Sequence, residues 1–352
     1  MLYEMKNPHG GDVYGETVLL DFSSNVNPLG TPPAVIDAIQ NAAFGVRRYP
    51  DPYCRELTRA IAACEGVLTS YILCGGGAAE LIYAYCDAGR FSRAAMPTPT
   101  FSEYASAAEH FGAEIVRYPL SLEREFLLDD GICSFLEKEK PDALFLCTPN
   151  NPTGRTIPLP LLRDILELCG RMGARVLLDE CFLDFTGVQS AKTLLDRFPG
   201  LTILKAFTKN YALAGVRVGY CLTADAGFLS RMATCTQPWN VSVLAQAAGV
   251  AAVGEKEFLL RAREMLSGER RFLSSGLADF GFSVCPSEAN YLLFRAPVGL
   301  DDALKKEKIA IRNCENYPGL GPGWCRVAVR LHEENAALLD AVRCRLNEVC
   351  GS

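Results

Sequence analysis

The chain has 352 residues, of which 49% are hydrophobic and 22% are charged, and its formal net charge is −6. A chain of this length and composition is typical of a globular protein with about two domains. The negative net charge argues against a nucleic-acid-binding surface, which needs a clustered excess of lysine and arginine. Its apolar stretches are interrupted before the roughly 20 residues that a membrane span requires, so we expect no membrane partner.

Cysteine and histidine usage bears on redox state and on metal binding. The chain has 15 cysteines and three histidines, and no CxxC pair occurs. The number of cysteines is odd, and most of them lie in apolar segments, as small buried residues do in a reducing compartment. We therefore expect reduced cysteines, a cytoplasmic protein without a secretory signal, and no metal site.

Short apolar runs alternate with amphipathic stretches through the middle of the chain. The strands expected there are 71–74, 93–96, 114–117, 143–147, 175–179, 201–206 and 217–221. The helices expected between them are 78–88, 102–112, 130–139 and 159–172. Continuous apolar runs such as 143–147 suit strands that are covered on both faces. This alternation predicts an α/β domain with a mostly parallel central sheet.

The pattern changes after about residue 240. Helices expected over 242–253 and 255–279 precede strand-like segments at 290–294, 309–312 and 325–329 and a closing helix near 333–348. This order indicates a smaller α+β domain. We therefore divide the chain into an N-terminal segment that packs across both domains, a large domain and a small C-terminal domain, with the bounds 1–40, 41–240 and 241–352.

Two turns follow predicted strands, at the edge of the sheet where open α/β proteins bind ligands. The first turn, 75–78 (GGGA), could present backbone N–H groups at a helix start to an anion. A tight strand-to-helix turn explains the same glycines equally well. The second turn, 148–154 (TPNNPTG), is either a rigid turn or a support for a side-chain amide that donates to a ligand.

Three charged residues stand close to the ends of other predicted strands. Asp179 ends an apolar strand, where a buried carboxylate needs a partner. A cationic atom of a ligand could be that partner, or the carboxylate could cap a helix or turn. Lys209 follows the strand 201–206, and Arg217 comes eight residues later. Taken in order, the motifs meet the needs of pyridoxal 5′-phosphate (PLP). This cofactor needs an amine for its Schiff base, an acid for its ring nitrogen and donors for its phosphate.

On these motifs the chain resembles the fold-type I PLP-dependent enzymes of the aminotransferase class I/II superfamily, over nearly its whole length. The resemblance implies the PLP-dependent transferase fold, with Lys209 and Asp179 as catalytic residues that also bind PLP. Further PLP contacts are implied for Gly76, Gly77, Ala78, Phe101, Asn151, Thr208 and Arg217. Tyr49, in the motif RYPDP, resembles the tyrosine that reaches the PLP phosphate of the neighbouring subunit, which implies a homodimer with shared active sites.

Two branches of this family share RYPDP, NNPTG and the spacing from lysine to arginine: histidinol-phosphate aminotransferases and the threonine-phosphate decarboxylases of cobalamin synthesis. The chain is more similar to the decarboxylases in HGG at 9–11 and DFSSNVNPLG at 21–30, in its paired C-terminal arginines, and in Phe182, where most aminotransferases carry a tyrosine. This implies decarboxylation of threonine O-phosphate or serine O-phosphate. The substrate contacts it implies are His9, Asn25, Arg312 and Arg326.

Other interpretations stay open on the sequence alone. The chain could be an aminotransferase acting on histidinol phosphate or an aromatic amino acid, or a PLP-binding module without activity. A nicotinamide-binding oxidoreductase is disfavoured, because the glycines at 75–77 do not form GxGxxG. Taken singly, His9, Arg312 and Arg326 could be surface charges, and Phe101 could belong to the core. Two alanines, Ala78 and Ala206, stand where relatives often have hydroxyl groups facing the phosphate. Backbone N–H groups and Arg217 would therefore contribute more to binding the PLP phosphate.

Overall fold

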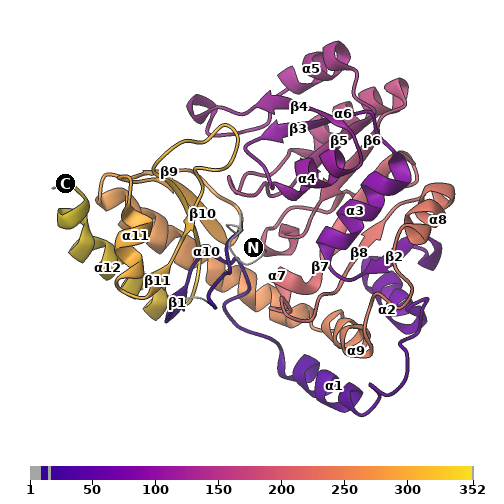
Figure 1. Cartoon of the computed structure of the whole chain (residues 1–352), viewed down its shortest axis with the longest axis horizontal. Coiled ribbons are helices and arrows are strands. Elements are labelled where there is room, and N and C mark those ends of the chain that lie inside the picture. Colours follow the sequence, from indigo (N-terminus) through magenta and orange to yellow (C-terminus); the bar gives the residue numbers. More distant parts are fainter. Residues whose placement is uncertain (1–8, 15–16, 351–352) are drawn as a thin grey trace.

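The computed structural model describes residues 9–14 and 17–350, with side chains as far as residue 346. Figure 1 shows a large sheet with helices around it, and the C-terminal strands and helices gathered beside it. The described helices are α1 (Pro33–Ala43), α2 (Arg55–Glu65), α3 (Ala78–Gly89), α4 (Glu103–His110), α5 (Gly131–Glu139), α6 (Leu159–Met172), α7 (Phe207–Asn210), α8 (Ala226–Thr234), α9 (Val243–Ala252), α10 (Lys256–Asp279), α11 (Leu300–Lys305) and α12 (His332–Cys350).

Seven strands form the central sheet in the order β2-β8-β7-β6-β5-β3-β4. They are β2 (Ile72–Gly75), β3 (Arg93–Thr98), β4 (Glu114–Pro119), β5 (Ala143–Cys147), β6 (Arg175–Asp179), β7 (Leu201–Ala206) and β8 (Gly219–Leu222). Strand β8 runs antiparallel to β2 and β7, and the other neighbours are parallel. Each strand predicted in this region is present, and the α/β fold with a mostly parallel sheet is confirmed.

Strand β8 begins two residues later than the sequence predicts. Arg217 has a φ of +60°, in the left-handed region that an extended strand does not use. The residue therefore belongs to the turn that precedes β8, and the strand starts only at Gly219.

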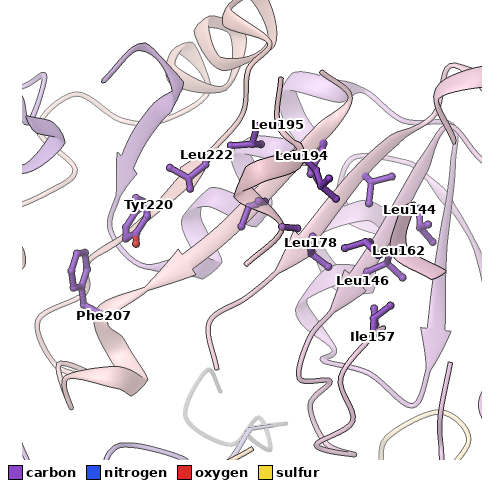
Figure 2. Packing of buried hydrophobic residues seen from close by; sticks show 14 of the residues in the cluster. Leu144, Leu146, Ile157, Leu162, Leu178, Leu194, Leu195, Phe207, Tyr220 and Leu222 are labelled. Atoms are coloured by element: carbon purple, nitrogen blue, oxygen red, sulfur yellow. The ribbon is translucent and has the colours of Figure 1, made fainter. Parts of the chain in front are cut away.

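Hydrophobic residues cover both faces of the central sheet. Every residue of β5 is buried. Leu144 and Leu146 belong to one hydrophobic cluster, whereas Phe145 belongs to the other. Figure 2 shows the first cluster, which includes Leu162 of α6. Side chains alternate between the faces of a strand, so a continuous apolar run is what a strand between two helical layers requires.

Local signals explain where the predicted helices begin and end. Helix α6 begins after Pro158, has a second proline in its first turn and ends at Gly173, whose φ is +73°. Proline is favoured in the first turn because its missing N–H has no helical partner there, and glycine adopts the left-handed C-cap without strain.

The C-terminal region forms two smaller sheets. A four-stranded antiparallel sheet has the order β12 (Arg312–Asn313), β13 (Trp324–Ala328), β10 (Tyr291–Arg295) and β9 (Ser283–Val284). The predicted strand 309–312 is divided between this sheet and a parallel pair of β1 (Leu20–Asp21) with β11 (Ile309–Ala310). Helix α10 packs against α12 beside these strands.

The N-terminal segment contacts elements from distant parts of the sequence. Its strand β1 pairs with β11, and its helix α1 packs against α9, which also contacts α2. Residues 1–8 and 15–16 of this segment lie outside the described residues. The division of the chain into three parts at residues 40 and 240 stays a prediction.

The described cysteines are free, and ten of these fourteen are buried, as expected for reduced apolar side chains. Within the described ranges, the structure contains no helix with the length and apolarity needed to traverse a bilayer.

Candidate active site

A cavity of about 490 Å³ lies where the parallel strands end, with Cys147 of β5, Asp179 of β6 and Ala206 of β7 in its wall. This is the edge at which open α/β sheets bind their ligands. The structure brings most of the predicted site residues together here: His9, Asn25, Ala78, Phe101, Asn151, Asp179, Thr208, Lys209, Arg217, Arg312 and Arg326.

Lys209 lies in the short helix α7, directly after β7, and its side chain lines the cavity. Burial, reinforced by the positive charges of Arg326 and Arg217, lowers the pKa of Lys209 to about 8. A lysine with this pKa has a substantial unprotonated fraction just above neutral pH. Since the unprotonated amine is the nucleophile, Lys209 is suited to react with a carbonyl group.

Asp179 is the buried carboxylate of the site, with 5% of the residue exposed. Its Oδ2 accepts a hydrogen bond of 2.7 Å from the Tyr104 hydroxyl, and its Oδ1 accepts one of 2.8 Å from the backbone N–H of Cys181. Burial raises the pKa of Asp179, and these hydrogen bonds offset the effect only in part. A cation bound beside Asp179 would favour its charged form.

The glycine turn brings the start of α3 close to Arg217. Gly77 has a φ of +98°, and a Cβ added to it would lie 2.6 Å from Nη2 of Arg217. Ala78, at the first position of α3, lines the cavity, whereas Gly76 and Gly77 are not among its lining residues. The N–H of Gly76 donates to Glu80. Backbone donors at the start of α3, together with Arg217 and Thr208, are therefore the groups available to an anion here.

Arg326 is buried on β13 and is held from several sides. Its Nη2 donates to the carbonyl of Ser23 at 2.8 Å, and its Nη1 donates to Oδ1 of Asn151. Its Nε is buried and has no hydrogen-bond partner in the part of the chain that is described. Because Oδ1 of Asn151 is occupied by Arg326, the NH₂ group of that amide is the part that can donate to a ligand.

The N-terminal HGG motif reaches the cavity. Nε2 of His9 lies 2.9 Å from a carboxylate oxygen of Glu103, and the His9 ring centre lies 5.8 Å from that of Phe101. The N–H of Gly11 donates to the Ser23 hydroxyl at 2.8 Å, so the motif is fastened to the segment after β1. Oδ1 of Asn25 is a buried acceptor without a hydrogen-bond partner among the described residues.

Arg312 and Tyr317 form another part of the cavity wall. The guanidinium carbon of Arg312 lies 5.4 Å from the centre of the Tyr317 ring, and its Nη2 donates to Asn316 at 2.8 Å. Arg330, which the sequence analysis did not assign to the site, pairs with Glu334 at 2.7 Å and donates to the carbonyl of Asp21. The structure thus places Arg312 and Arg326 at the cavity and Arg330 in a structural contact.

Tyr49 is a predicted site residue that lies at the exposed surface of the chain. It is not among the residues that line the cavity, and 79% of it is exposed. Its ring packs against that of Trp239, with centres 4.7 Å apart and the ring planes tilted by 30°. The position of Tyr49 within one chain therefore leaves its predicted contact with a neighbouring subunit as a proposal.

Sequence reasoning missed several residues of the cavity wall, of which Tyr104 and Glu103 matter most. Both lie in the motif FSEY that contains Phe101, so their position beside a predicted PLP contact could have indicated that they belong to the site. Their roles depend on partners far away in the sequence, Asp179 for Tyr104 and His9 for Glu103, and only the fold brings these pairs together.

The family model for aminotransferase classes I and II matches residues 17–342. The chain is 36% identical over 349 residues to threonine-phosphate decarboxylase of Salmonella typhimurium, covering 95% of each chain. It is 32% identical over 348 residues to histidinol-phosphate aminotransferase of Methanothermobacter thermautotrophicus, covering 94% of this chain and 90% of that one. The solved histidinol-phosphate aminotransferase of Clostridium acetobutylicum matches with a TM-score of 0.87 and 28% identity, covering 94% of this chain and 100% of the other.

The fold and the site define a PLP-dependent enzyme. The chain belongs to the aminotransferase class I and II family.

The cavity fits PLP, the cofactor of this family. Lys209 offers an amine with a lowered pKa, and Asp179 is a buried carboxylate that a cation would stabilise in its charged form. The close approach of Gly77 to Arg217 leaves no room for a side chain beside the guanidinium. Lys209 and Asp179 would thus hold the aldehyde and ring nitrogen of PLP, and the start of α3 with Arg217 would hold its phosphate.

Proposed function

We propose that the chain is a PLP-dependent lyase that decarboxylates a phosphorylated amino acid. Its substrate is threonine O-phosphate, with serine O-phosphate as a second candidate, and the product from threonine O-phosphate is 1-amino-2-propanol O-phosphate, as in cobalamin synthesis. The observation that carries the proposal is one cavity in which Lys209 and Asp179 lie with Arg326, Arg312 and His9. The guanidinium groups of Arg326 and Arg312 are cationic, and His9 offers ring nitrogens for hydrogen bonds, so the cavity suits a substrate with two anionic groups. The 36% identity to a threonine-phosphate decarboxylase supports this choice.

The protein's own residues supply attachment, charge and proton transfer. When bound, PLP supplies an aldehyde for the substrate amine and a ring that withdraws electrons from the α-carbon. Lys209 would hold the cofactor, and its Nζ, with a pKa of about 8, would be able to hold a proton near neutral pH and deliver it to the α-carbon. Asp179 would supply a negative charge to the ring nitrogen, and Tyr104 and the N–H of Cys181 fix the orientation of that carboxylate.

Which bond at the α-carbon breaks depends on how the substrate's anions are held. Decarboxylation would need the substrate to be oriented so that the bond to its carboxylate is weakened, whereas transamination would need the C–H bond to be weakened instead. We propose that Arg326 and Arg312 bind the carboxylate, and that His9 and Asn25 bind the phosphate at the N-terminal side. Phe182, buried in the cavity wall against Tyr291, offers no hydroxyl group to the ring oxygen, unlike the tyrosine that most aminotransferases carry.

The alternative is an aminotransferase of the histidinol-phosphate type, and the 32% identity to such an enzyme supports it. The purified protein should be incubated with threonine phosphate, serine phosphate and histidinol phosphate, while CO₂ and keto products are both measured. We expect CO₂ from the first or second substrate without any added keto acid. Glutamate formed from 2-oxoglutarate and histidinol phosphate, without CO₂, would establish the alternative.

Arg326→Ala tests the substrate site within this proposal. We expect kcat/KM for decarboxylation to fall about tenfold to hundredfold, the range that corresponds to losing a charge-assisted hydrogen bond of about 1.5–3 kcal/mol. Arg330→Ala is the matched control, because Arg330 contacts Glu334 and Asp21 rather than the cavity. An equal loss in both variants would remove the argument for Arg326 as a substrate residue.

We also propose a cytoplasmic homodimer in which each subunit contributes Tyr49 to the neighbouring active site. The exposed contact between Tyr49 and Trp239 supports this, because large aromatic side chains left in water mark a surface that another chain covers.

A further inference from the structure

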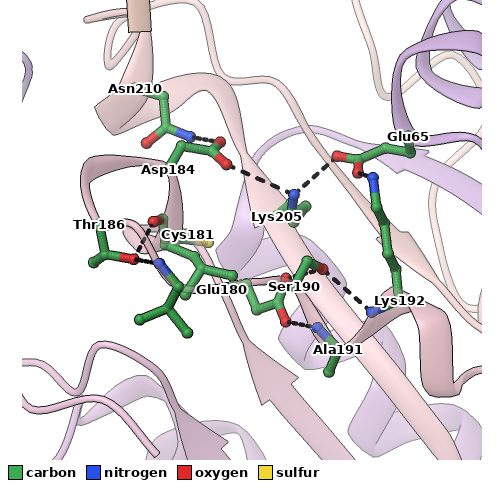
Figure 3. Close-up of polar contacts among 12 residues, drawn as sticks. Glu65, Glu180, Cys181, Asp184, Thr186, Ser190, Ala191, Lys192, Lys205 and Asn210 are labelled. Atoms are coloured by element: carbon green, nitrogen blue, oxygen red, sulfur yellow. Dashed lines mark hydrogen bonds and ion pairs between the residues drawn. The ribbon is translucent and has the colours of Figure 1, made fainter. Parts of the chain in front are cut away.

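A network of buried charges lies beneath the active site, on the opposite face of the central sheet. Ala206 lines the cavity, so Lys205, the preceding residue of β7, points to the other face. Nζ of Lys205 lies 2.9 Å from Oε1 of Glu65 and 3.9 Å from Oδ1 of Asp184, and Nζ of Lys192 lies 2.7 Å from Oε2 of Glu65 (Figure 3). The network therefore cannot touch a ligand in the cavity directly.

The charges in this network hold one another in place. Burial opposes the charge of Lys205, but Asp184, Glu65 and Glu180 together raise its pKa above the ordinary value. Burial likewise opposes the charge of Glu65, yet its pKa is lowered to about 2, first by Lys205 and then by hydrogen bonds from Lys192 and Tyr220. Paired charges in such an environment stay ionised and keep a fixed geometry.

One contact connects the network to helix α7, which carries Lys209. Oδ2 of Asp184 accepts a hydrogen bond of 2.6 Å from Nδ2 of Asn210, the residue after Lys209 (Figure 3). Oδ1 of Asn210 is buried and has no hydrogen-bond partner among the described residues, so Asp184 is the contact that orients this amide. On the other side, Asn27 donates to the carbonyl oxygens of Lys209 and Asn210 at 2.9 and 2.8 Å.

Helix α7 needs such contacts because it is only four residues long. Helices this short do not hold their conformation without tertiary contacts. We propose that Asp184, fixed by the buried pair of Lys205 and Glu65, is a positioning residue that sets the place of Lys209 Nζ in the cavity. This inference rests on the proposed role of Lys209 as the residue that binds PLP.

The test is a double-mutant cycle on the bond between Asp184 and Asn210. PLP is added to cofactor-free wild type, Asp184→Ala, Asn210→Ala and the double variant, and the rate at which Lys209 becomes labelled is followed by borohydride trapping and peptide mass spectrometry. A displacement of about 1 Å in a reacting group can lower a rate about a hundredfold, so we expect each single variant to be slower by about tenfold to hundredfold. The double variant should be no slower than either single one, because both remove the same bond.

Two further variants separate positioning from stability. Asp184→Asn keeps an oxygen that can accept from Asn210, so it should restore most of the labelling rate. Ser190→Ala removes a hydrogen bond of 2.6 Å from Ser190 to Glu180 in the same region, with no contact to α7, and should lower the unfolding temperature without slowing the labelling. Asn210→Ala serves alone if Asp184→Ala does not fold.

The results distinguish this inference from the proposed function. The inference alone would be overturned if folded Asp184→Ala or Asn210→Ala kept the wild-type labelling rate. Additive effects in the double variant would also overturn it. If Lys209 of the wild type takes no label while another lysine does, the proposed function fails as well.

Discussion

Asp179 combines a destabilising buried position with the electronic role proposed for it. Its carboxylate is buried, and burial raises its pKa in the protein without cofactor. We expect Asp179→Asn to unfold at the same temperature as wild type or higher without PLP, because a neutral amide is less costly to bury. With PLP its turnover should fall about tenfold to hundredfold, since a hydrogen bond to a charged group contributes about 1.5–3 kcal/mol. Thermal unfolding and steady-state kinetics measure the two effects, and near-wild-type turnover would assign the role to another residue.

Lys209 makes the site sensitive to pH. Its ordinary pKa is 10.5, and burial, with Arg326 and Arg217, lowers the pKa to about 8 in the folded chain without cofactor. Only the unprotonated amine attacks an aldehyde, so the rate of PLP attachment should rise with pH, reach half its maximum near 8 and level off above that. Borohydride trapping at a series of pH values measures this profile. A midpoint near 10.5 would mean that the lysine is not in the environment described above.

At the scale of elements, the turn before α3 has to approach Arg217 closely. We expect Gly77→Ala to weaken PLP binding, because its Cβ would press on Nη2 of Arg217. Gly112→Ala is the matched control: Gly112 also has a positive φ, +89°, but a Cβ there would meet nothing within 4 Å. Both variants should lose about 1–3 kcal/mol of stability, because a side chain at a positive φ strains the backbone. Absorbance titration with PLP should show weaker binding in Gly77→Ala alone, and equal binding in both would exclude the contact as its cause.

The elements that sequence periodicity predicts are those with a strong apolar pattern. Strands β5, β6 and β7 appear where predicted because nearly every position in them is buried. Helix α7 carries no such signal, since four residues are too few for a helical period and its conformation depends on Asn27 and Asp184. For the same reason, the ordered motifs located Lys209 and Asp179 at one cavity, but the partners that tune them, such as Tyr104, lie at distances in sequence that no local pattern spans.

For the whole molecule, the exposed aromatic residues around Tyr49 support the proposed homodimer. Phe44, Tyr49 and Tyr53 are 87%, 79% and 70% exposed, and Trp239, which packs against Tyr49, is 47% exposed. Burial of aromatic side chains of this size stabilises an association strongly. We therefore expect a second copy of the chain to bury these side chains. Tyr49 does not line the cavity of its own chain, which agrees with its proposed contact with the active site of the partner subunit.

Shared active sites can be tested by mixing two defective subunits. Lys209→Ala lacks the amine proposed to bind PLP, and Tyr49→Ala lacks the side chain proposed to reach the neighbouring PLP phosphate. In a hybrid dimer, the Tyr49→Ala subunit keeps Lys209 and receives an intact Tyr49 from its partner, so one of its two sites is complete. Random reassociation makes half of the dimers hybrids, so a 1:1 mixture should recover about one quarter of wild-type activity. Activity no higher than the mean of the two parents, or a monomer by size-exclusion chromatography, would show that each chain builds its site alone.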